Sequence, residues 1–286
     1  MILVADSGST KCDWKLVNDD RKVVEFFQTR GFNPFFESSR EIFDELQRSE
    51  YLEACSNDVT ELYYFGAGCS SPGRKEILQI ALRLMFRNAD VVVEHDLLGG
   101  ALATCDDRPG IACILGTGSN AGFFDGRRLD DDVHALGYLL GDEGSGSYFG
   151  KKLLADYLYN KLPPKMREQL ESRYDLDKER IFDNVYKNPK PNIYLASFAR
   201  FLSDNQDHYY VRNLVMQGLL EFIDIHVCRF PEYQKVPVHF VGSIAYFFED
   251  ILRNVAERKG LIMGKIVKEP IHNLTDYLIQ QTKQPI

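Results

Sequence analysis

The same local pattern occurs twice in this chain: a strand-forming segment, a turn of glycine and hydroxyl side chains, and a second strand-forming segment. The first copy spans residues 2–17 with its turn at 6–10, and the second spans residues 111–124 with its turn at 116–120. Apolar runs separated by glycine turns are typical of paired strands. The repeat therefore predicts two duplicated halves with a cleft between them.

The rest of the chain alternates strand-forming and helical segments, which places it in the α/β class. Ile77, Ile80, Ala81, Leu84 and Met85 fall at helical spacing, so we expect a helix over 74–87 that buries them. Further helices are expected over residues 38–52, 97–105, 151–159, 193–203, 211–230, 247–259 and 271–281, and further strands over 22–27, 61–66, 91–93 and 238–241.

Charge and hydropathy exclude several classes of function. Lys and Arg number 34 against 42 Asp and Glu, a net charge of −8, and no basic run is present. Such a chain is a poor candidate for binding nucleic acid or an anionic membrane surface. No apolar stretch has the ~18 residues of a membrane-spanning helix, and we expect no signal peptide, because the first residues show neither a basic region nor a cleavage-site pattern. Six cysteines without a C-x-x-C pair indicate free thiols in a reducing cytoplasm.

Several nucleotide-binding and catalytic motifs are absent from the sequence: the P-loop, the dinucleotide-binding G-x-G-x-x-G after a strand, the protein-kinase H-R-D and the G-x-S-x-G elbow. The two glycine turns remain. Small residues let backbone N–H groups approach phosphate oxygens, and Ser and Thr hydroxyls add further donors. One such turn is commonly only a turn, whereas two of them beside acidic residues point to a phosphate site.

Two aspartates stand where an acid could serve phosphate chemistry. Asp6 precedes the first turn, and a carboxylate beside phosphates is reasonable if Mg²⁺ lies between them. Asp96 follows the expected strand at 91–93, where α/β sheets place their ligands, and could accept a proton from a substrate hydroxyl. The alternatives are a turn-capping role for Asp6 and a helix N-cap role for Asp96.

Two later segments could also contribute to a site. Residues 142–147 form an acidic, glycine-rich turn, for which the start of a helix is the alternative interpretation. Gly242 and Ser243 separate an apolar strand from a helix, and their bare backbone could support a nucleotide base or ribose.

Taken in order, these motifs resemble a known superfamily over nearly the whole chain. Residues 6–11 resemble the first phosphate motif of sugar kinases in the actin/hexokinase/Hsp70 superfamily, 115–120 the second, and 241–244 the adenosine motif. Residues 31–33, 94–96 and 140–145 resemble N-acetylglucosamine kinase and its relatives. That subgroup, the BadF/BadG/BcrA/BcrD ATPase family, includes the activator ATPases of benzoyl-CoA reductase and 2-hydroxyacyl-CoA dehydratase.

The resemblance implies two RNase H-like lobes, residues 1–106 and 107–270, with a C-terminal helix at 271–286 joining the first. It implies ATP, Mg²⁺ and a sugar as ligands, with Asp96 as the general base and Asp6 holding the metal. The implied sugar-binding residues are Asn33, Asp96, Ser119, Asn120 and Asp142. The implied ATP-binding residues are Gly8, Ser9, Thr10, Lys11, Gly116, Thr117, Gly118, Gly242 and Ser243.

Two departures from the family pattern bear on the choice of sugar. Ser7 and Ser9 stand where glycine is common in the first motif, and residues 135–138 lack the Trp and His that often precede the acidic turn. Both leave open whether the sugar is acetylated. Neither affects the residues implied to transfer the phosphoryl group.

The expected activity is ATP-dependent phosphorylation of the primary hydroxyl of an amino sugar, N-acetylglucosamine first among them, and the resemblance also implies a homodimer. One alternative is an activator ATPase with an iron–sulfur cluster, for which Cys105 and Cys113 are the nearest cysteines to the lobe junction although their setting does not match a cluster loop. Another is a sugar-sensing regulator without catalysis. We expect no nucleic-acid or membrane partner.

Overall fold

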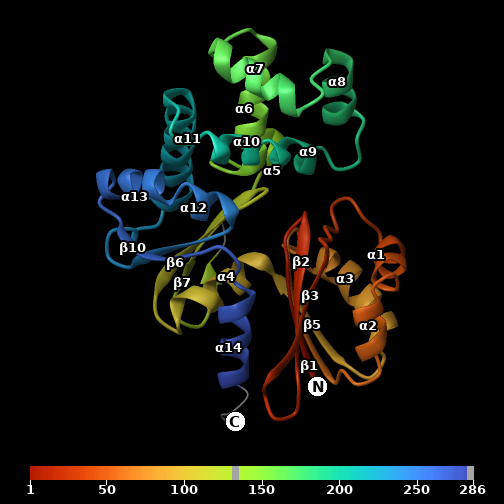
Figure 1. Cartoon of the computed structure of the whole chain (residues 1–286). Helices are drawn as coiled ribbons and strands as arrows, with labels where there is room; N and C mark the ends of the chain where they lie inside the picture. Colours follow the sequence, from red (N-terminus) through yellow and green to blue (C-terminus); the bar gives the residue numbers. More distant parts are fainter. Residues whose placement is uncertain (131–134, 282–286) are drawn as a thin grey trace. The chain divides into compact units, whose positions relative to one another are not determined.

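The computed structural model describes residues 1–130 and 135–281 of the chain. The chain separates into two compact units: Met1–Asp107 joined by the segment from Glu269, and Arg108–Lys268. Each unit is built on one five-stranded sheet (Figure 1). Of the expected C-terminal helix at 271–286, the part beyond residue 281 lies outside the described residues.

In the first unit the sheet has the strand order β3-β2-β1-β4-β5. Strands β1, β2 and β3 form an antiparallel meander, and β4 and β5 continue the sheet parallel to β1. The strands are β1 (Ile2–Ser7), β2 (Lys11–Val17), β3 (Val23–Arg30), β4 (Glu61–Gly66) and β5 (Asp90–His95).

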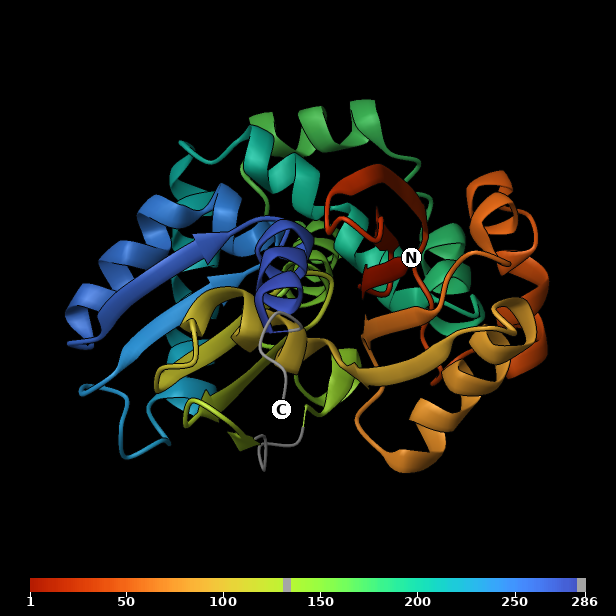
Figure 2. The same cartoon turned by 90° about the horizontal axis from the view of Figure 1, so that it is seen from below.

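Helices cover both faces of this sheet because its buried strands alternate apolar side chains between the two faces. Leu3 and Ala5 belong to the core cluster that also contains Ile42 and Leu78, whereas Val4 packs in the separate cluster of the C-terminal helix. Both views show that helix, α14, beside α4, and the two are in contact (Figures 1 and 2). The helices are α1 (Ser39–Leu46), α2 (Glu50–Cys55), α3 (Pro72–Met85), α4 (Asp96–Cys105) and α14 (Ile271–Gln281).

The sheet of the second unit repeats the topology of the first. Its order is β10-β9-β6-β7-β8, with an antiparallel meander β6-β7-β8 and with β9 and β10 parallel to β6. The matching strand order confirms the duplication that the repeated glycine turns predict. The strands are β6 (Gly110–Leu115), β7 (Ser119–Phe124), β8 (Leu129–Asp130), β9 (Pro237–Val241) and β10 (Ile262–Val267).

Most of the helical content lies in the second unit, where one large cluster of buried apolar side chains joins the helices to the sheet. Its helical elements are α5 (Gly137–Leu140), α6 (Gly146–Leu158), α7 (Pro164–Arg173), α8 (Lys178–Tyr186), α9 (Pro191–Ser197), α10 (Ala199–Asp204), α11 (Tyr209–Phe222), the π-helical turn η1 (Ile223–Val227), α12 (Ser243–Phe247) and α13 (Glu249–Arg258).

Some sequence predictions are wrong in detail. The expected helix at 38–52 is two helices, because Ser49 caps α2 by accepting the N–H of Leu52. The expected buried face of α3 is wrong in part. Ala81 is buried, and Ile77 and Met85 pack against the core cluster, but Ile80 and Leu84 are 45% and 49% exposed. Spacing gives the period of a helix, but the packing partners set its rotation. The buried side chains of α3 are Leu78, Ala81 and Leu82.

All six cysteines are free thiols, and five of them are buried. Among the helices of the described residues, none combines the length and apolar character needed to cross a lipid bilayer.

Candidate active site

The first glycine turn lies between β1 and β2 and packs directly on the backbone of Gly31. The N–H of Gly31 donates to the carbonyl oxygen of Thr10 at 3.0 Å. A Cβ added to Gly31 would lie only 2.0 Å from the carbonyl oxygen of Gly8 and 2.8 Å from the carbonyl carbon of Ser9. Glycine is therefore required at position 31, because any side chain would displace the turn.

The side chain of Asn33 is tied to the same turn. Its Nδ2 donates to Oγ of Ser9 at 3.1 Å, and its Oδ1 accepts the N–H of Phe35 at 3.0 Å. An expected sugar-binding residue and an expected phosphate-binding residue therefore lie in contact. The bonds to Ser9 and Phe35 fix the orientation of the amide, which keeps one N–H and one lone pair for a ligand.

Asp6, at the end of β1, is the centre of an acidic cluster. Burial, and then the charges of Asp96 and Asp13, raise the pKa of Asp6 to about 7. Lys11 opposes this shift, but its ammonium is engaged by Asp13 at 2.9 Å and by Glu269 at 3.0 Å. Within the described part of the chain, the carboxylate of Asp6 itself has no ion pair. A cation brought by a ligand would relieve this repulsion.

This donor set fits Mg²⁺. Among the described residues, no three His, Cys, Asp or Glu side chains are placed so that they could hold a metal ion together. Mg²⁺ usually takes one or two carboxylates, with water and phosphate oxygens completing its octahedron. Asp6, partly buried and beside the phosphate turn, meets that requirement, while Asp13 is occupied by Lys11 and by the Nε2 of Gln28 at 2.6 Å.

Asp96 is the first residue of α4, directly after the parallel strand β5. Its Oδ1 accepts the N–H of Leu97 at 3.0 Å and lies 3.3 Å from Nε2 of His95, the residue that caps the helix. The N-cap interpretation of Asp96 is therefore wrong by one position, since His95 is the cap. The Asp96 side chain is 19% exposed, so its second oxygen can reach a ligand.

The second glycine turn, in the other unit, is bonded to the start of α6. The N–H of Gly146 donates to the carbonyl oxygen of Gly116 at 2.8 Å, and the N–H of Ser147 donates to that of Thr117 at 3.0 Å. The hydroxyl of Ser145 caps α6 by accepting the N–H of Tyr148. The acidic segment is thus also the start of a helix, as its alternative interpretation proposed.

Asp142 lies against the second glycine turn. Its carboxylate accepts the N–H of Ser119 at 3.3 Å and the hydroxyl of Ser147 at 3.4 Å. Burial, opposed by these two bonds and increased by the charge of Glu143, raises the pKa of Asp142 to about 6. The turn and the acidic segment therefore form one cluster within the second unit.

Ser119 and Asn120 belong to strand β7 and are both buried. The Oδ1 of Asn120 accepts the N–H of Ala121 at 2.9 Å, which leaves its amide N–H groups for another partner. The Oγ of Ser119 is buried without any hydrogen-bond partner. An unsatisfied buried hydroxyl costs about 1–3 kcal/mol, and a ligand hydroxyl or carbonyl would remove that cost.

Gly242 and Ser243 lie beside the second turn. Gly242 has φ +113°, and a Cβ there would lie 2.4 Å from the carbonyl oxygen of Leu115, the last residue of β6. Gly242 also precedes the first residue of α12. The expected adenosine motif and the expected second phosphate motif are therefore in direct backbone contact.

Sequence reasoning missed a buried pair next to Asp142. Nε2 of His226 lies 2.9 Å from Oε2 of Glu143, and both side chains are largely buried. Glu143 lies inside the acidic, glycine-rich segment, so the sequence already pointed to its neighbourhood. Nothing in the sequence pointed to His226, because the π-helical turn η1 that contains it has the sequence pattern of an ordinary helix.

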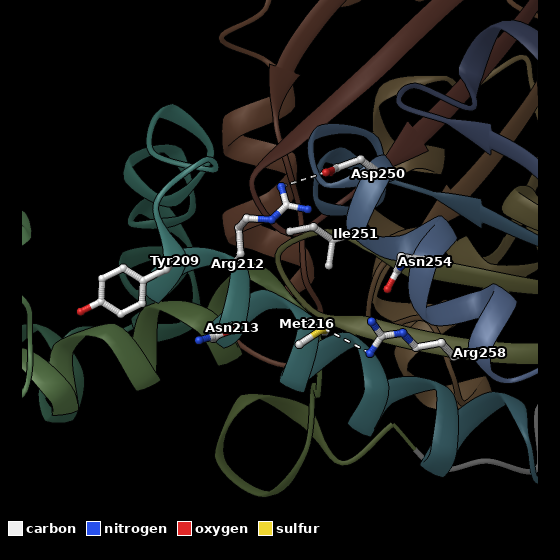
Figure 3. A pocket seen from close by; sticks show the side chains of 8 residues that line it. All are labelled: Tyr209, Arg212, Asn213, Met216, Asp250, Ile251, Asn254 and Arg258. Carbon is white, nitrogen blue, oxygen red and sulfur yellow. Dashed lines mark hydrogen bonds and ion pairs between the residues drawn. The ribbon is translucent and has the colours of Figure 1, made fainter.

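A separate pocket of about 400 Å³ lies between α11 and α13 (Figure 3). Arg212 pairs with Asp250 at one side of it, and Arg258 donates to the sulfur of Met216 at the other. None of the expected site residues lines this pocket.

Comparison with family models finds no match, and comparison with curated proteins finds none either. Among solved structures, a Porphyromonas gingivalis protein provisionally described as an N-acetylglucosamine kinase has 38% identity and a TM-score of 0.91, covering 99% of this chain and 100% of its own. A Chromobacterium violaceum protein with the same provisional description has 17% identity and a TM-score of 0.67, with 97% and 98% coverage.

A glucokinase of the ROK family from Streptomyces griseus, solved with glucose and AMPPNP, shares the fold at 15% identity, with a TM-score of 0.57 and coverage of 98% and 99%. The 38% identity to the Porphyromonas gingivalis protein extends over essentially the full length of both chains. The chain belongs to the N-acetylglucosamine kinase-like family of sugar kinases in the actin/hexokinase/Hsp70 superfamily.

Proposed function

We propose that this sugar kinase transfers the γ-phosphoryl group of ATP to the primary hydroxyl of an amino sugar, converting N-acetylglucosamine to N-acetylglucosamine 6-phosphate. One observation carries the proposal: Asp6, near the end of β1, leads into the first glycine turn, and Asp96, directly after β5, lies near enough for its charge to raise the pKa of Asp6. A pair of acids beside a phosphate-sized turn suits a metal-bound phosphate and a substrate hydroxyl.

Asp96 would act as the general base. The sugar hydroxyl oxygen attacks the γ-phosphorus, the bond from that phosphorus to the β–γ bridging oxygen breaks, and ADP leaves. Asp96 accepts the hydroxyl proton as the new P–O bond forms. Its bond to the N–H of Leu97 and its proximity to His95 hold the carboxylate in place for this transfer.

Asp6 would hold Mg²⁺, directly or through water. When bound, Mg²⁺ neutralises the charge that develops on the phosphate oxygens. Gly8, Ser9, Thr10 and Lys11 would bind phosphate through backbone N–H groups, hydroxyls and an ammonium. The close contact of Gly31 with this turn supports the proposed phosphate binding, because the contact holds the turn in one conformation.

In the second unit, Gly116, Thr117 and Gly118 would bind phosphate, and Gly242 and Ser243 would support the adenosine. The sugar-binding residues that we propose in this unit are Asp142, Ser119 and Asn120. In the first unit the sugar-binding residue that we propose besides Asp96 is Asn33. The unpartnered Oγ of Ser119 supports this assignment, because a sugar hydroxyl or an acetamido carbonyl would satisfy it.

The choice of N-acetylglucosamine rests on the provisional name of the Porphyromonas gingivalis protein. We propose ATP as the phosphoryl donor because of the two glycine turns. We propose a cytoplasmic location because the cysteines are free thiols. A homodimer stays a prediction. The activator ATPase is not favoured, because the relatives are sugar kinases and both Cys105 and Cys113 are buried.

A coupled assay of ADP release tests the proposal with N-acetylglucosamine, glucosamine, glucose, N-acetylmannosamine and N-acetylmuramic acid. We expect the highest kcat/KM with N-acetylglucosamine. Faster release with another of these sugars would assign the enzyme to that substrate. If no sugar stimulated ADP release from Mg·ATP, the proposed reaction would be wrong.

A further inference from the structure

The acidic segment before α6 has a strained backbone that needs support. Asp142 has φ +58° and Gly144 has φ +71°. The left-handed region is unfavourable for a residue with a side chain, and such strain persists only where the surroundings impose it. Residues 141–145 must therefore be held by contacts with the elements around them.

The end of α11 supplies this support. A Cβ on Gly144 would lie 3.0 Å from Cβ of Phe222 and 3.2 Å from the carbonyl oxygen of Gly218, so the segment packs on the last turns of α11. Four residues after Phe222, the ring of His226 stacks on the Phe222 ring at a centroid distance of 5.1 Å. Phe222 therefore contacts both the acidic segment and the ring of His226.

The π-helical turn directs His226 toward Glu143. In η1 the N–H of Cys228 donates to the carbonyl oxygen of Ile223, five residues earlier, at 2.8 Å. One extra residue in a helical turn rotates the following side chains by ~100° relative to a continuous α-helix. Such wide turns are rare in proteins, and many of those that do occur lie at functional sites. Here the turn places Nε2 of His226 at 2.9 Å from Oε2 of Glu143.

The pair is also costly, which argues that it serves a purpose. Nδ1 of His226 is buried and has no hydrogen-bond partner. An ionised carboxylate can only accept, so the Nε2 of His226 carries the hydrogen that Glu143 accepts. The exposed fraction is 5% for the His226 side chain and 14% for that of Glu143. An apolar pair in the same place would avoid this polar burial.

We propose that Glu143 and His226 are positioning residues for substrate binding: their hydrogen bond holds residues 141–145 so that the carboxylate of Asp142 stays on the N–H of Ser119. The inference rests on the proposed function, in which Asp142 binds the sugar. Neither residue needs to touch the sugar. Without the bond, Glu143 leaves its buried position, and the adjacent Asp142 loses its fixed orientation.

Three substitutions separate positioning from general stability. His226→Phe keeps a ring that can stack on Phe222 but removes the donor, and His226→Gln restores a donor of similar reach. Tyr148→Phe is the matched control, because it removes the 2.6 Å hydrogen bond from Tyr148 to Glu221, a second link between α6 and α11 that does not involve residues 141–145.

We expect His226→Phe to raise the sugar KM at least 10-fold while changing the ATP KM less than 2-fold. His226→Gln should return the sugar KM to within 3-fold of the native value, and Tyr148→Phe should leave it unchanged. An unchanged sugar KM in His226→Phe, or equal KM values for the Phe and Gln variants, would overturn the inference. Should His226→Phe not fold, Glu143→Gln, which weakens the same bond, is expected to raise the sugar KM at least 3-fold.

Amide hydrogen exchange gives a readout that needs no substrate. In His226→Phe, exchange at residues 141–145 should accelerate at least 10-fold, and in Tyr148→Phe it should not change. Exchange at native rates in both variants would refute the positioning role even in an enzyme with full activity. Conversely, accelerated exchange together with an enzyme inactive on every amino sugar would reject the proposed substrate while keeping the positioning role.

Discussion

The charge of Asp96 raises the pKa of Asp6, which reaches about 7 through burial and the neighbouring acids. Asp6 lies near the end of β1 and Asp96 directly follows β5, and in the sheet only β4 separates these two parallel strands. In the proposed reaction the two residues have different tasks: Asp96 accepts a proton and Asp6 binds a cation. Substituting each separately should therefore affect different steps.

Replacing Asp96 by asparagine should abolish most phosphoryl transfer. The amide keeps the size and the bond from Leu97 but cannot accept the hydroxyl proton. We expect kcat for the sugar to fall by about 100-fold or more, in the range typical of a lost general base, with ATP binding retained. The coupled ADP assay measures kcat, and titration calorimetry measures the binding of ATP.

Asp90→Asn is the control for this variant, because Asp90 is an exposed acid at the opposite end of the same strand. It should keep native activity. Native kcat in Asp96→Asn would remove Asp96 from the role of general base.

Gly31→Ala should disable the first glycine turn. The added Cβ would lie 2.0 Å from the carbonyl oxygen of Gly8, so the turn has to move. We expect the KM for ATP to rise at least 10-fold and the melting temperature to fall by several degrees, because overpacking costs about 1–3 kcal/mol. Steady-state kinetics and thermal unfolding measure the two effects.

Gly73→Ala is a matched control, since a Cβ at Gly73 in α3 would meet nothing within 4 Å. Alanine is the better helix former, so this variant should be as stable as the native protein or slightly more stable. If Gly31→Ala had the same KM for ATP and the same melting temperature as Gly73→Ala, the packing of Gly31 against the turn would contribute neither to ATP binding nor to stability.

The parts of the site that sequence could predict are those made by local chain geometry. The glycine turns follow from short apolar runs interrupted by small residues, and Ser38 and Glu41, three residues apart, form a capping box at the start of α1. Asp96 lies at a strand end because one strand and one helix meet there. All of these depend on residues that are neighbours in the chain.

The parts that sequence could not predict depend on packing between distant segments. The rotation of α3, the contact of Gly31 with Gly8, and the bond between Glu143 and His226 each involve surfaces chosen by the whole fold. The π-helical turn is the clearest case, because nothing in residues 223–227 distinguishes it from a regular helix. Ser119 and Asn120 were expected in the turn but belong to β7, where strand pairing buries them.

The raised pKa of Asp6 predicts a pH-dependent loss of stability. In the unfolded chain this carboxyl ionises near its ordinary value of 3.8, whereas in the folded protein it ionises at about 7. Between these values the folded state binds more protons, so stability falls as pH rises through the interval. Below pH ~3 the group is mostly neutral in both states, and above pH ~7 the folded state bears the full cost of its charge.

Asp6→Asn should remove that cost and the cation site together. Without ligands, its melting temperature should equal that of the native protein at pH ~3 and exceed it at pH 8, by about 2–4 °C for each kcal/mol relieved. With saturating Mg·ATP the order should reverse at pH 8, because only the native carboxylate binds the metal. Asp20→Asn, in the exposed β2–β3 turn, is the control. Equal melting temperatures at pH 8, with and without Mg·ATP, would show that Asp6 is neither strained by its neighbours nor a metal ligand.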